Sequence, residues 1–462
     1  MVFSSLLFLF RFLPITFLIY YLVPFKAKNT VLFLASLFFY TWGETKFFPI
    51  MLISIGINYV AGLLIERYDH NEKARKACFW VAFLVTLGFL LFFKYTNFFL
   101  SNINALLGLS LPLLDSAEFH LPLGISFYTF QILAYTMDVY RRKIKVEHNL
   151  IDFGAFVVLF PQLIAGPIVL YSDISRELKS RKITLAQIDE GVGLFIMGLA
   201  SKILLADTIG ALWTEVQTLG FSQVSTPLAW MGIIAYSFQI YFDFSGYSLM
   251  AIGLGRMLGF FFPQNFNYPY ISKSITEFWR RWHITLSSWF RDYVYIPLGG
   301  NRVKKSRQFF NIFVVWFLTG FWHGAAWNFI FWGLYFFVLL MIEKSFLLKY
   351  LEKSKVLSHV YLIFFIIISW GIFALSDLSQ MGALFNRMFS LHGGTDWMYY
   401  LRDYAAMFVL CILASTPFFK KLADSAAGKN RVVRTVFLAG VLVVCVAFMV
   451  DSTYSPFLYF NF

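Results

Sequence analysis

Apolar runs of roughly 20 residues recur along almost the whole chain, and they restrict its fold more than any other feature. Of the 462 residues, 59% are hydrophobic and only 14% are charged. Soluble domains carry about 25% charged residues, so the composition excludes an ordinary soluble protein. Because a helix of about 20 apolar residues spans the hydrocarbon core of a bilayer, the sequence predicts an all-α polytopic membrane protein.

Basic clusters between these runs predict how the chain crosses the membrane, because cytoplasmic loops are rich in Lys and Arg. The clusters Lys26–Lys28, Arg67–Lys76 and Arg141–Lys145 follow the first, third and fifth runs. Continued along the chain, this alternation predicts about 12 crossings, with the N- and C-termini outside. The same loops account for the net charge of +13, so we expect no nucleic acid partner.

We expect a single integral-membrane domain over residues 1–462. Within it we expect N-terminal spans at residues 1–120, a catalytic core with both histidine motifs at residues 121–345, and C-terminal spans at residues 346–462. The chain shows no convincing internal repeat, which counts against the inverted symmetry that is common in transporters.

Two apolar runs do not fit simple crossings. Leu150–Leu170 has basic residues on both sides, and its segment FPQLIAGPI contains two prolines and a glycine that break a helix. This pattern predicts a re-entrant segment lining a cavity, with Gln162 in it. Phe309–Glu343 is also bounded by basic residues on both sides, and its length predicts a hairpin that bends near Trp322–Ala326.

The segment Glu277–Tyr293 has helical periodicity with two unlike faces. The expected apolar face holds Phe278, Trp279, Trp282, Leu286, Trp289, Phe290 and Tyr293. The expected polar face holds Glu277, Arg280, Arg281, His283, Ser287, Ser288 and Arg291. One interpretation is an interfacial helix with its aromatic face in lipid. The other is a cytoplasmic funnel whose arginines attract an anionic donor, because the guanidinium fork suits phosphate.

His323 lies deep in the predicted hairpin, between Gly320 and Gly324. A buried histidine is commonly a satisfied core residue, but polar groups within a membrane are costly and tend to mark chemistry. We expect the two glycines to leave room for a substrate beside the ring. An imidazole that titrates near neutrality is a natural base for deprotonating a hydroxyl group.

Asp243 lies within another apolar run, where a carboxylate needs a partner. An arginine or a histidine ring is a plausible partner, while helix–helix contact is the commoner role for a polar residue such as Gln162. The histidines are too scattered for a zinc site, and the three cysteines lie singly, so we expect no metal.

Several long motifs resemble the membrane-bound O-acyltransferase family, and within it the alginate O-acetyltransferase branch. They include FWRRWHITLSSWFRDYVYIPLGGNR (Phe278–Arg302), GFWHG (Gly320–Gly324), FPQLIAGPI (Phe160–Ile168) and NFNYPY (Asn265–Tyr270). The resemblance implies a ring of about 11–12 transmembrane helices with re-entrant segments around a central tunnel. It also implies a location in the bacterial cytoplasmic (inner) membrane.

The resemblance further implies that His323 is the catalytic base and that His283 is a second participant. Acetyl-CoA is the expected donor, with no tightly bound cofactor. The expected acceptor is an extracytoplasmic polysaccharide or a partner protein, such as an SGNH-type acetyltransferase or a polysaccharide synthase complex. The residues that we expect to bind the donor or to line the tunnel are Trp279, Arg280, Arg281, Trp282, Ser287, Arg291, Asp243, Gln162 and Trp322.

Two alternatives remain at this point. A D-alanyl transferase of the teichoic-acid pathway, which uses a carrier-protein donor, shares the RRWH and WHG motifs. The tail IPLGGNR (Ile296–Arg302) and the length of the chain favour the acetyl branch. A non-catalytic transporter would also contain buried polar residues and a basic funnel, but the WHG motif counts against it.

Overall fold

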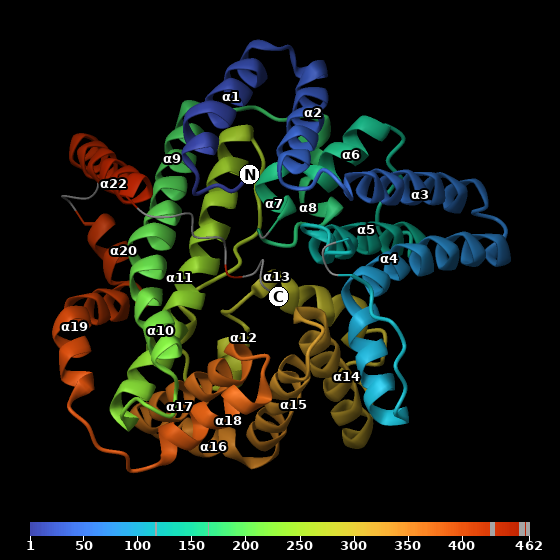
Figure 1. The fold of residues 1–462 in the computed structure, drawn as a ribbon. Helices are drawn as coiled ribbons and strands as arrows, with labels where there is room; N and C mark the ends of the chain where they lie inside the picture. The colour runs from blue at the N-terminus through green and yellow to red at the C-terminus, as the bar shows by residue number, and fades with distance from the viewer. Residues whose placement is uncertain (116–117, 165, 426–429, 452–457, 459–462) are drawn as a thin grey trace. The chain divides into compact units, whose positions relative to one another are not determined.

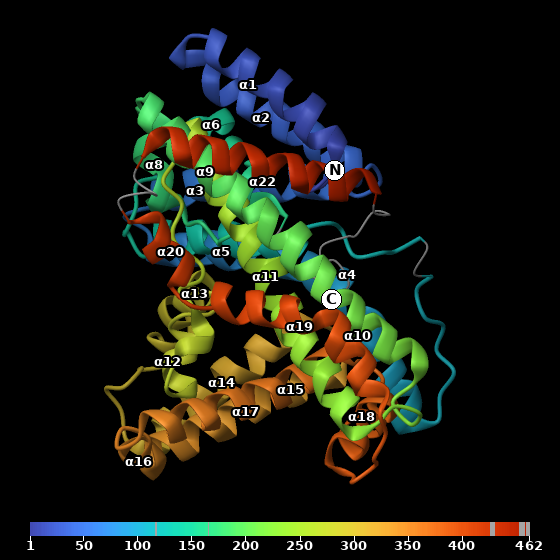
Figure 2. The ribbon, with the colours of Figure 1, turned by 90° about the vertical axis from the view of Figure 1, so that its left-hand side faces the viewer.

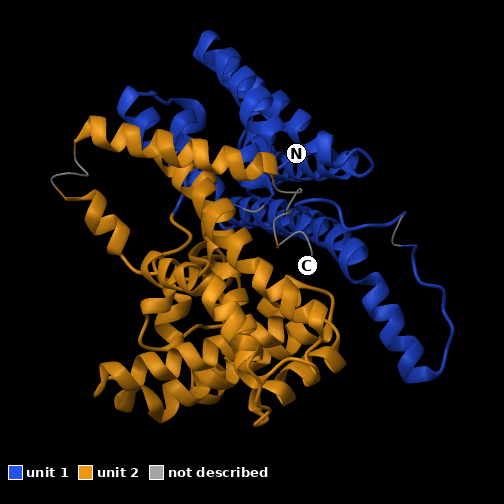
Figure 3. Ribbon diagram, turned by 60° about the vertical axis from the view of Figure 1, so that its left-hand side comes forward, with its two compact units in different colours: residues 1–192, 251–263 blue, residues 193–250, 264–462 orange. Residues whose placement is uncertain are grey.

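A computed structural model describes the chain except residues 116–117, 165, 426–429, 452–457 and 459–462. Every regular element in the described part is a helix, which confirms the predicted all-α class (Figure 1). The chain forms two compact units (Figure 3). Unit 1 comprises Met1–Val192 and Ala251–Pro263, and unit 2 comprises Gly193–Met250 and Gln264–Phe462.

Seven helices among the described residues are long and apolar enough to cross a membrane. They are α3 (Phe48–Arg67), α4 (Glu72–Leu107), Leu185–Leu219 (α9, η2 and α10), Trp327–Leu351 (from α15), α17 (Lys355–Ala374), α19 (Asp396–Ala414) and α22 (Arg431–Asp451). This confirms a multi-pass membrane protein. Shorter apolar helices such as Phe8–Leu22 fall below that length, so the predicted number of crossings, the ring and the tunnel stay predictions.

The helix-breaking segment of unit 1 is confirmed. Helix α6 (Leu150–Val158) ends before α7 (Phe160–Leu163), and α8 (Tyr171–Lys179) follows. Nine residues rise only about 14 Å, so α6 is too short to cross a core of about 30 Å. Gln162 is fully buried, and its Nε2 donates to the Phe156 carbonyl oxygen at 2.6 Å. Its Oε1 is buried and has no hydrogen-bond partner among the described residues, so the place of Gln162 in a cavity or tunnel wall stays a prediction.

The predicted hairpin of unit 2 is confirmed. Helix α14 (Lys305–His323) and α15 (Trp327–Ile342) run antiparallel around a bend at residues 324–326, and α17 lies beside α15 (Figure 2). The first two helices meet at glycines. A Cβ on Gly320 would lie 2.3 Å from the Phe329 carbonyl oxygen, and one on Gly333 would lie 2.4 Å from that of Trp316. Such small residues let membrane helices approach closely.

We expect Gly320→Ala to lower the free energy of unfolding by roughly 1–3 kcal/mol, because the added methyl group pushes α14 from α15. The measurement is the thermal unfolding midpoint of the purified protein in detergent. Gly88→Ala in α4 is the matched control, because a Cβ at Gly88 meets nothing within 4 Å. Equal midpoints for the two variants would contradict the close contact at Gly320.

Candidate active site

The expected single helix over Glu277–Tyr293 is wrong. Helix α12 (Ile275–Trp279) ends before a turn, and α13 (Ile284–Phe290) begins after it. The π-helical turn η4 (Arg291–Tyr295) follows. His283 at the break has φ of 43°, a left-handed conformation that a continuous α-helix does not allow.

The turn is held in place from both ends. The N–H of Asn267 donates to the Arg281 carbonyl oxygen at 2.9 Å, and that of Ile284 donates to the Asn265 carbonyl oxygen at 3.0 Å. At the start of α12, the buried Glu343 carboxylate accepts from the N–H groups of Ile275 (2.6 Å) and Thr276 (2.9 Å). These bonds satisfy backbone groups that the broken helix leaves without intrahelical partners.

The two-sided pattern of this segment survives the break. All seven residues of the expected apolar face are buried inside the protein, so an aromatic face in lipid is excluded: Phe278, Trp279, Trp282, Leu286, Trp289, Phe290 and Tyr293. On the polar side, Arg280 and Arg291 are exposed, and Arg281 and Ser287 are half-buried. His283 was expected on that polar face, but it is only 1% exposed because the turn directs it inward.

Asn265 fixes the orientation and the tautomer of the His283 ring. His283 Nδ1 lies 3.1 Å from Asn265 Oδ1, and this oxygen also accepts from the Thr285 hydroxyl at 2.9 Å. The Asn265 Nδ2 donates to Ser248 Oγ at 3.1 Å, which assigns the amide oxygen to the histidine side. A carbonyl oxygen only accepts, so Nδ1 carries the hydrogen and Nε2 carries the lone pair.

Three buried nitrogens in this region have no hydrogen-bond partner in the described part of the chain: His283 Nε2, Trp279 Nε1 and Trp332 Nε1. Buried polar atoms without a partner are rare and indicate a place for a water or a ligand. His283 lies outside the candidate spans, and its burial lowers its pKa to about 3. Its ring is therefore neutral near pH 7.

His323 ends α14 and is enclosed by aromatic rings. Its ring centroid lies 5.1 Å from Trp322, 5.0 Å from Trp332 and 5.3 Å from Phe373, and the residue is 4% exposed. The Trp322 ring also lies 6.2 Å from the His283 ring. Both predicted catalytic histidines therefore meet the same indole in one buried cluster.

The two glycines beside His323 do not provide space for a substrate. A Cβ on Gly324 would lie 2.1 Å from the Phe329 ring, and Gly320 faces the backbone of α15. The expectation of open space at these positions is wrong, because α15 already fills it.

The arginines differ in how far carboxylates neutralise them. Arg291 makes a two-point contact with Asp292 at 2.7 and 3.0 Å, and Arg281 pairs with Glu277 at 2.9 Å. Within the described residues, the exposed Arg280 forms no side-chain hydrogen bond or ion pair. Of the three, Arg280 is therefore the most available to an anion.

Asp243 pairs with a lysine and not with the expected arginine or histidine. Its Oδ1 lies 2.8 Å from Lys202 Nζ, and the same ammonium lies 2.8 Å from Asp207. Gln162 belongs to unit 1, whereas all the other predicted site residues belong to unit 2.

Sequence reasoning missed Asn265, Trp332 and Trp370. Trp370 lies 4.8 Å from the Trp282 ring and 6.3 Å from that of Trp332, so it joins the two histidine segments. Asn265 is the first residue of the motif NFNYPY, and its place in that motif was the available signal. Its distance from His283 along the sequence gave no indication that the two side chains are in contact.

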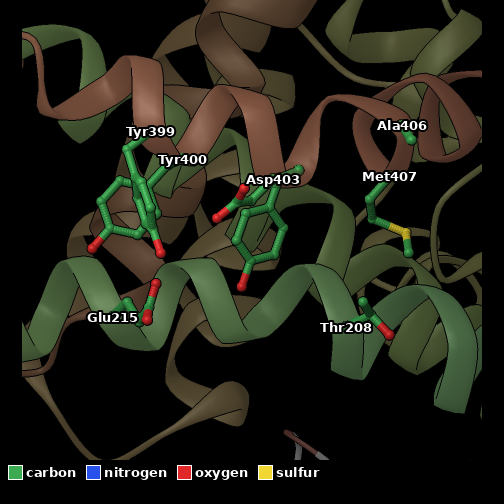
Figure 4. Close-up of a pocket in the computed structure, with 8 residues that line it drawn as sticks. Thr208, Glu215, Tyr399, Tyr400, Asp403, Ala406 and Met407 are labelled. Atoms are coloured by element: carbon green, nitrogen blue, oxygen red, sulfur yellow. The ribbon is translucent and has the colours of Figure 1, made fainter.

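A separate cavity of about 430 Å³ lies between α10 (Thr208–Leu219) and α19 (Figure 4). Glu215, Tyr399, Tyr400 and Asp403 are among its lining residues, and none of the predicted site residues lines it. It therefore does not contribute to the histidine cluster.

Residues 34–385 match the family described as "MBOAT, membrane-bound O-acyltransferase family". The chain is 40% identical to "Probable alginate O-acetylase AlgI" of Azotobacter vinelandii, over 86% of this chain and 79% of that protein. It is 34% identical to "Peptidoglycan O-acetyltransferase" of Helicobacter pylori, over 100% of this chain and 98% of that protein. It is 32% identical to "Teichoic acid D-alanyltransferase" of Streptococcus thermophilus, over 49% of this chain and 58% of that protein.

Proposed function

Since this chain belongs to the membrane-bound O-acyltransferase family, we propose that it transfers an acetyl group from acetyl-CoA toward an extracytoplasmic polysaccharide. The observation that carries the site assignment is the buried cluster in which His283 and His323 meet the same Trp322 ring. Relatives named for O-acetylation match most of both chains, whereas the D-alanyl relative matches about half, which favours acetyl transfer.

The proposed reaction is acyl transfer from a thioester to a hydroxyl group. The acceptor oxygen attacks the acetyl carbonyl carbon, so a C–O bond forms and the C–S bond breaks. His323 takes the hydroxyl proton as general base and passes it to the leaving thiolate. The surrounding Trp332 and Phe373 rings limit water at the imidazole, which protects the thioester from hydrolysis.

His283 is suited to positioning and not to taking the proton. With a pKa of about 3, placing a proton on it at pH 7 costs roughly 5 kcal/mol. Its Nε2 lone pair still accepts a hydrogen bond, and Asn265 holds the ring in one orientation. We assign to Nε2 the hydrogen bond that aligns the acceptor hydroxyl or the group that delivers it.

Arg280 is the proposed contact for the donor's phosphates, because the guanidinium groups of Arg281 and Arg291 are each paired with a carboxylate. Trp279, Trp282 and Trp322 would then line the path between this arginine and His323.

We place the protein in the bacterial cytoplasmic membrane with both termini outside. An SGNH-type acetyltransferase or a polysaccharide synthase complex is the proposed partner that receives the acetyl group.

The direct test uses sealed membrane vesicles that contain the full chain, acetyl-CoA labelled in the acetyl group, and an acceptor polymer. We expect label on the polymer or on a co-expressed SGNH-type partner. Transfer of D-alanine from a charged carrier protein, without acetyl transfer, would support the D-alanyl alternative. Passage of acetyl-CoA or polymer without any acyl transfer would support the transporter and overturn the proposal.

We expect Asn265→Ala to lower kcat on the order of 10²-fold, because His283 loses its fixed tautomer and orientation. Asn265→Asp keeps an acceptor for the Nδ1 hydrogen and should retain more activity than Asn265→Ala. Steady-state kinetics with labelled acetyl-CoA provide the measurement. If the two variants lose activity equally at equal protein stability, Asn265 does not act through the ring.

The buried His283 should also make the protein sensitive to acid. Its folded-state pKa of about 3 lies below the ordinary 6.5, so the unfolded state binds more protons between these values. Stability is therefore full above pH 6.5 and decreases as the pH falls, by roughly 2–3 kcal/mol at pH 4.5.

His283→Gln should flatten this part of the stability curve, because glutamine does not titrate. The measurement compares thermal midpoints in detergent at pH 7.0 and 4.5 for both proteins. Identical acid shifts in the two proteins would show that the ring is not held neutral by burial.

A further inference from the structure

A cavity of about 240 Å³ in unit 1 has a strongly basic lining that the proposed reaction does not use. Its charged residues are Arg176, Arg181, Lys182 and Glu177, three cations against one carboxylate. They lie on α8 and the loop that follows it. Such an excess of positive charge in a concave site favours an anion.

Arg181 is fixed in this wall by three hydrogen bonds and by contacts with aromatic rings. Its Nε donates to the Tyr20 hydroxyl at 2.8 Å, and its Nη1 donates to Asn29 Oδ1 at 2.8 Å and to the Glu177 carbonyl oxygen at 3.0 Å. The guanidinium carbon lies 4.5 Å from the Phe260 ring centroid. Its Nη2 is buried and has no hydrogen-bond partner among the described residues. A rigid guanidinium with an unused donor is prepared for an oxyanion.

The chain segment after α11 (Thr226–Leu258) contributes Gly259 and Phe261 to the lining. Gly259 has φ of 87°, and a Cβ there would lie 3.2 Å from Arg181 Cδ and 3.0 Å from Ile183 Cγ1. Glycine thus lets the backbone pass close to the arginine stem. Phe261 also lines the cavity, and the Arg256 guanidinium, which pairs with Glu190 at 3.7 Å, lies 4.1 Å from the Phe261 ring centroid.

The carboxylate restricts the class of ligand. Glu177 Oε2 is buried and has no hydrogen-bond partner in the described part of the chain. Next to three cations it does not cancel the attraction for a phosphate, and it offers an acceptor for a neighbouring hydroxyl group. We propose that this cavity binds a phosphate group that has a hydroxyl group beside it.

Two sources carry this chemistry, a glycerol-phosphate lipid headgroup and a ribose phosphate. The proposal does not rest on acetyl transfer, because it uses none of the histidine cluster. The test is a native mass-spectrometric titration of the purified full chain in detergent. Phosphatidylglycerol represents the lipid source, adenosine 3′,5′-bisphosphate represents the nucleotide source, and phosphatidylcholine provides a phosphate without the hydroxyl group.

The test variant is Arg176→Gln/Lys182→Gln, because both side chains are exposed and their loss leaves the Arg181 contacts intact. Each lost cation should weaken binding about fivefold, so the double variant should bind roughly 25-fold more weakly. Lys76→Gln is the matched control, an exposed cation of the same unit that lies outside the cavity lining.

Glu177→Gln tests the hydroxyl contact. It should reduce the preference for phosphatidylglycerol over phosphatidylcholine, because the amide accepts a hydrogen bond less strongly than the carboxylate. Weakened binding of phosphatidylglycerol alone in the double variant identifies a lipid site, and weakened binding of the bisphosphate alone identifies a nucleotide site. Binding that the double variant and Lys76→Gln reduce equally, or no binding of either ligand, overturns the proposal.

Discussion

His323→Ala should reduce acetyl transfer by about 10²–10⁴-fold, the usual effect of removing a general base. The ring lies against Trp322, Trp332 and Phe373, and none of these three aromatic side chains can take a proton in its place. The measurement is the initial rate of label transfer from acetyl-CoA in vesicles with equal amounts of protein. His359→Ala is the matched control, because that histidine lies on α17 and its Nδ1 is 2.8 Å from the Lys355 carbonyl oxygen of the same helix.

Glutamine variants separate the roles of the two histidines. Glutamine accepts a hydrogen bond but does not take a proton at neutral pH. His323→Gln should therefore be as inactive as His323→Ala, whereas His283→Gln should retain more activity than His283→Ala. The reverse order would assign the base to His283. Full activity in His323→Ala with stable protein would show that the proposed mechanism is wrong.

Features of the fold that follow from residue periodicity, flanking charges or helix-breaking residues were predictable from the sequence. The hairpin bend at residues 324–326 followed from an apolar run with basic residues at both ends. The prolines and glycine around Phe160–Ile168 predicted the break between α6 and α7. The apolar side of Glu277–Tyr293 was also predictable, because the alternation of residue types decides burial even where the helix is interrupted.

Features that depend on a tertiary partner were not predictable. Nothing local in RRWH marks the left-handed turn at His283, which is held by Asn265 and Asn267 from a different segment. The glycines beside His323 predicted open space for a substrate, but α15, including Phe329, fills that space. The roles of Gln162 and Asp243 likewise depend on Phe156 and Lys202, and periodicity carries no information about such pairings.

Lys202→Met should destabilise the protein by about 3–5 kcal/mol, because it leaves the buried Asp243 without its counter-ion. The Asp243 Oδ2 still accepts from the Leu458 N–H at 2.8 Å, but one neutral hydrogen bond does not replace an ammonium group. Asp207, the other partner of Lys202, is partly exposed. The measurement is the thermal midpoint in detergent, together with the yield of folded protein in membranes.

The double variant Lys202→Met/Asp243→Asn decides whether Asp243 has a role beyond the ion pair. It removes both buried charges, so most of the lost stability should return. If Asp243 serves only the fold, the double variant should also transfer acetyl groups at nearly the original rate. A stable but inactive double variant would show that the carboxylate acts in the reaction, as its place among the predicted site residues implied. Unchanged stability in Lys202→Met alone would contradict the buried ion pair itself.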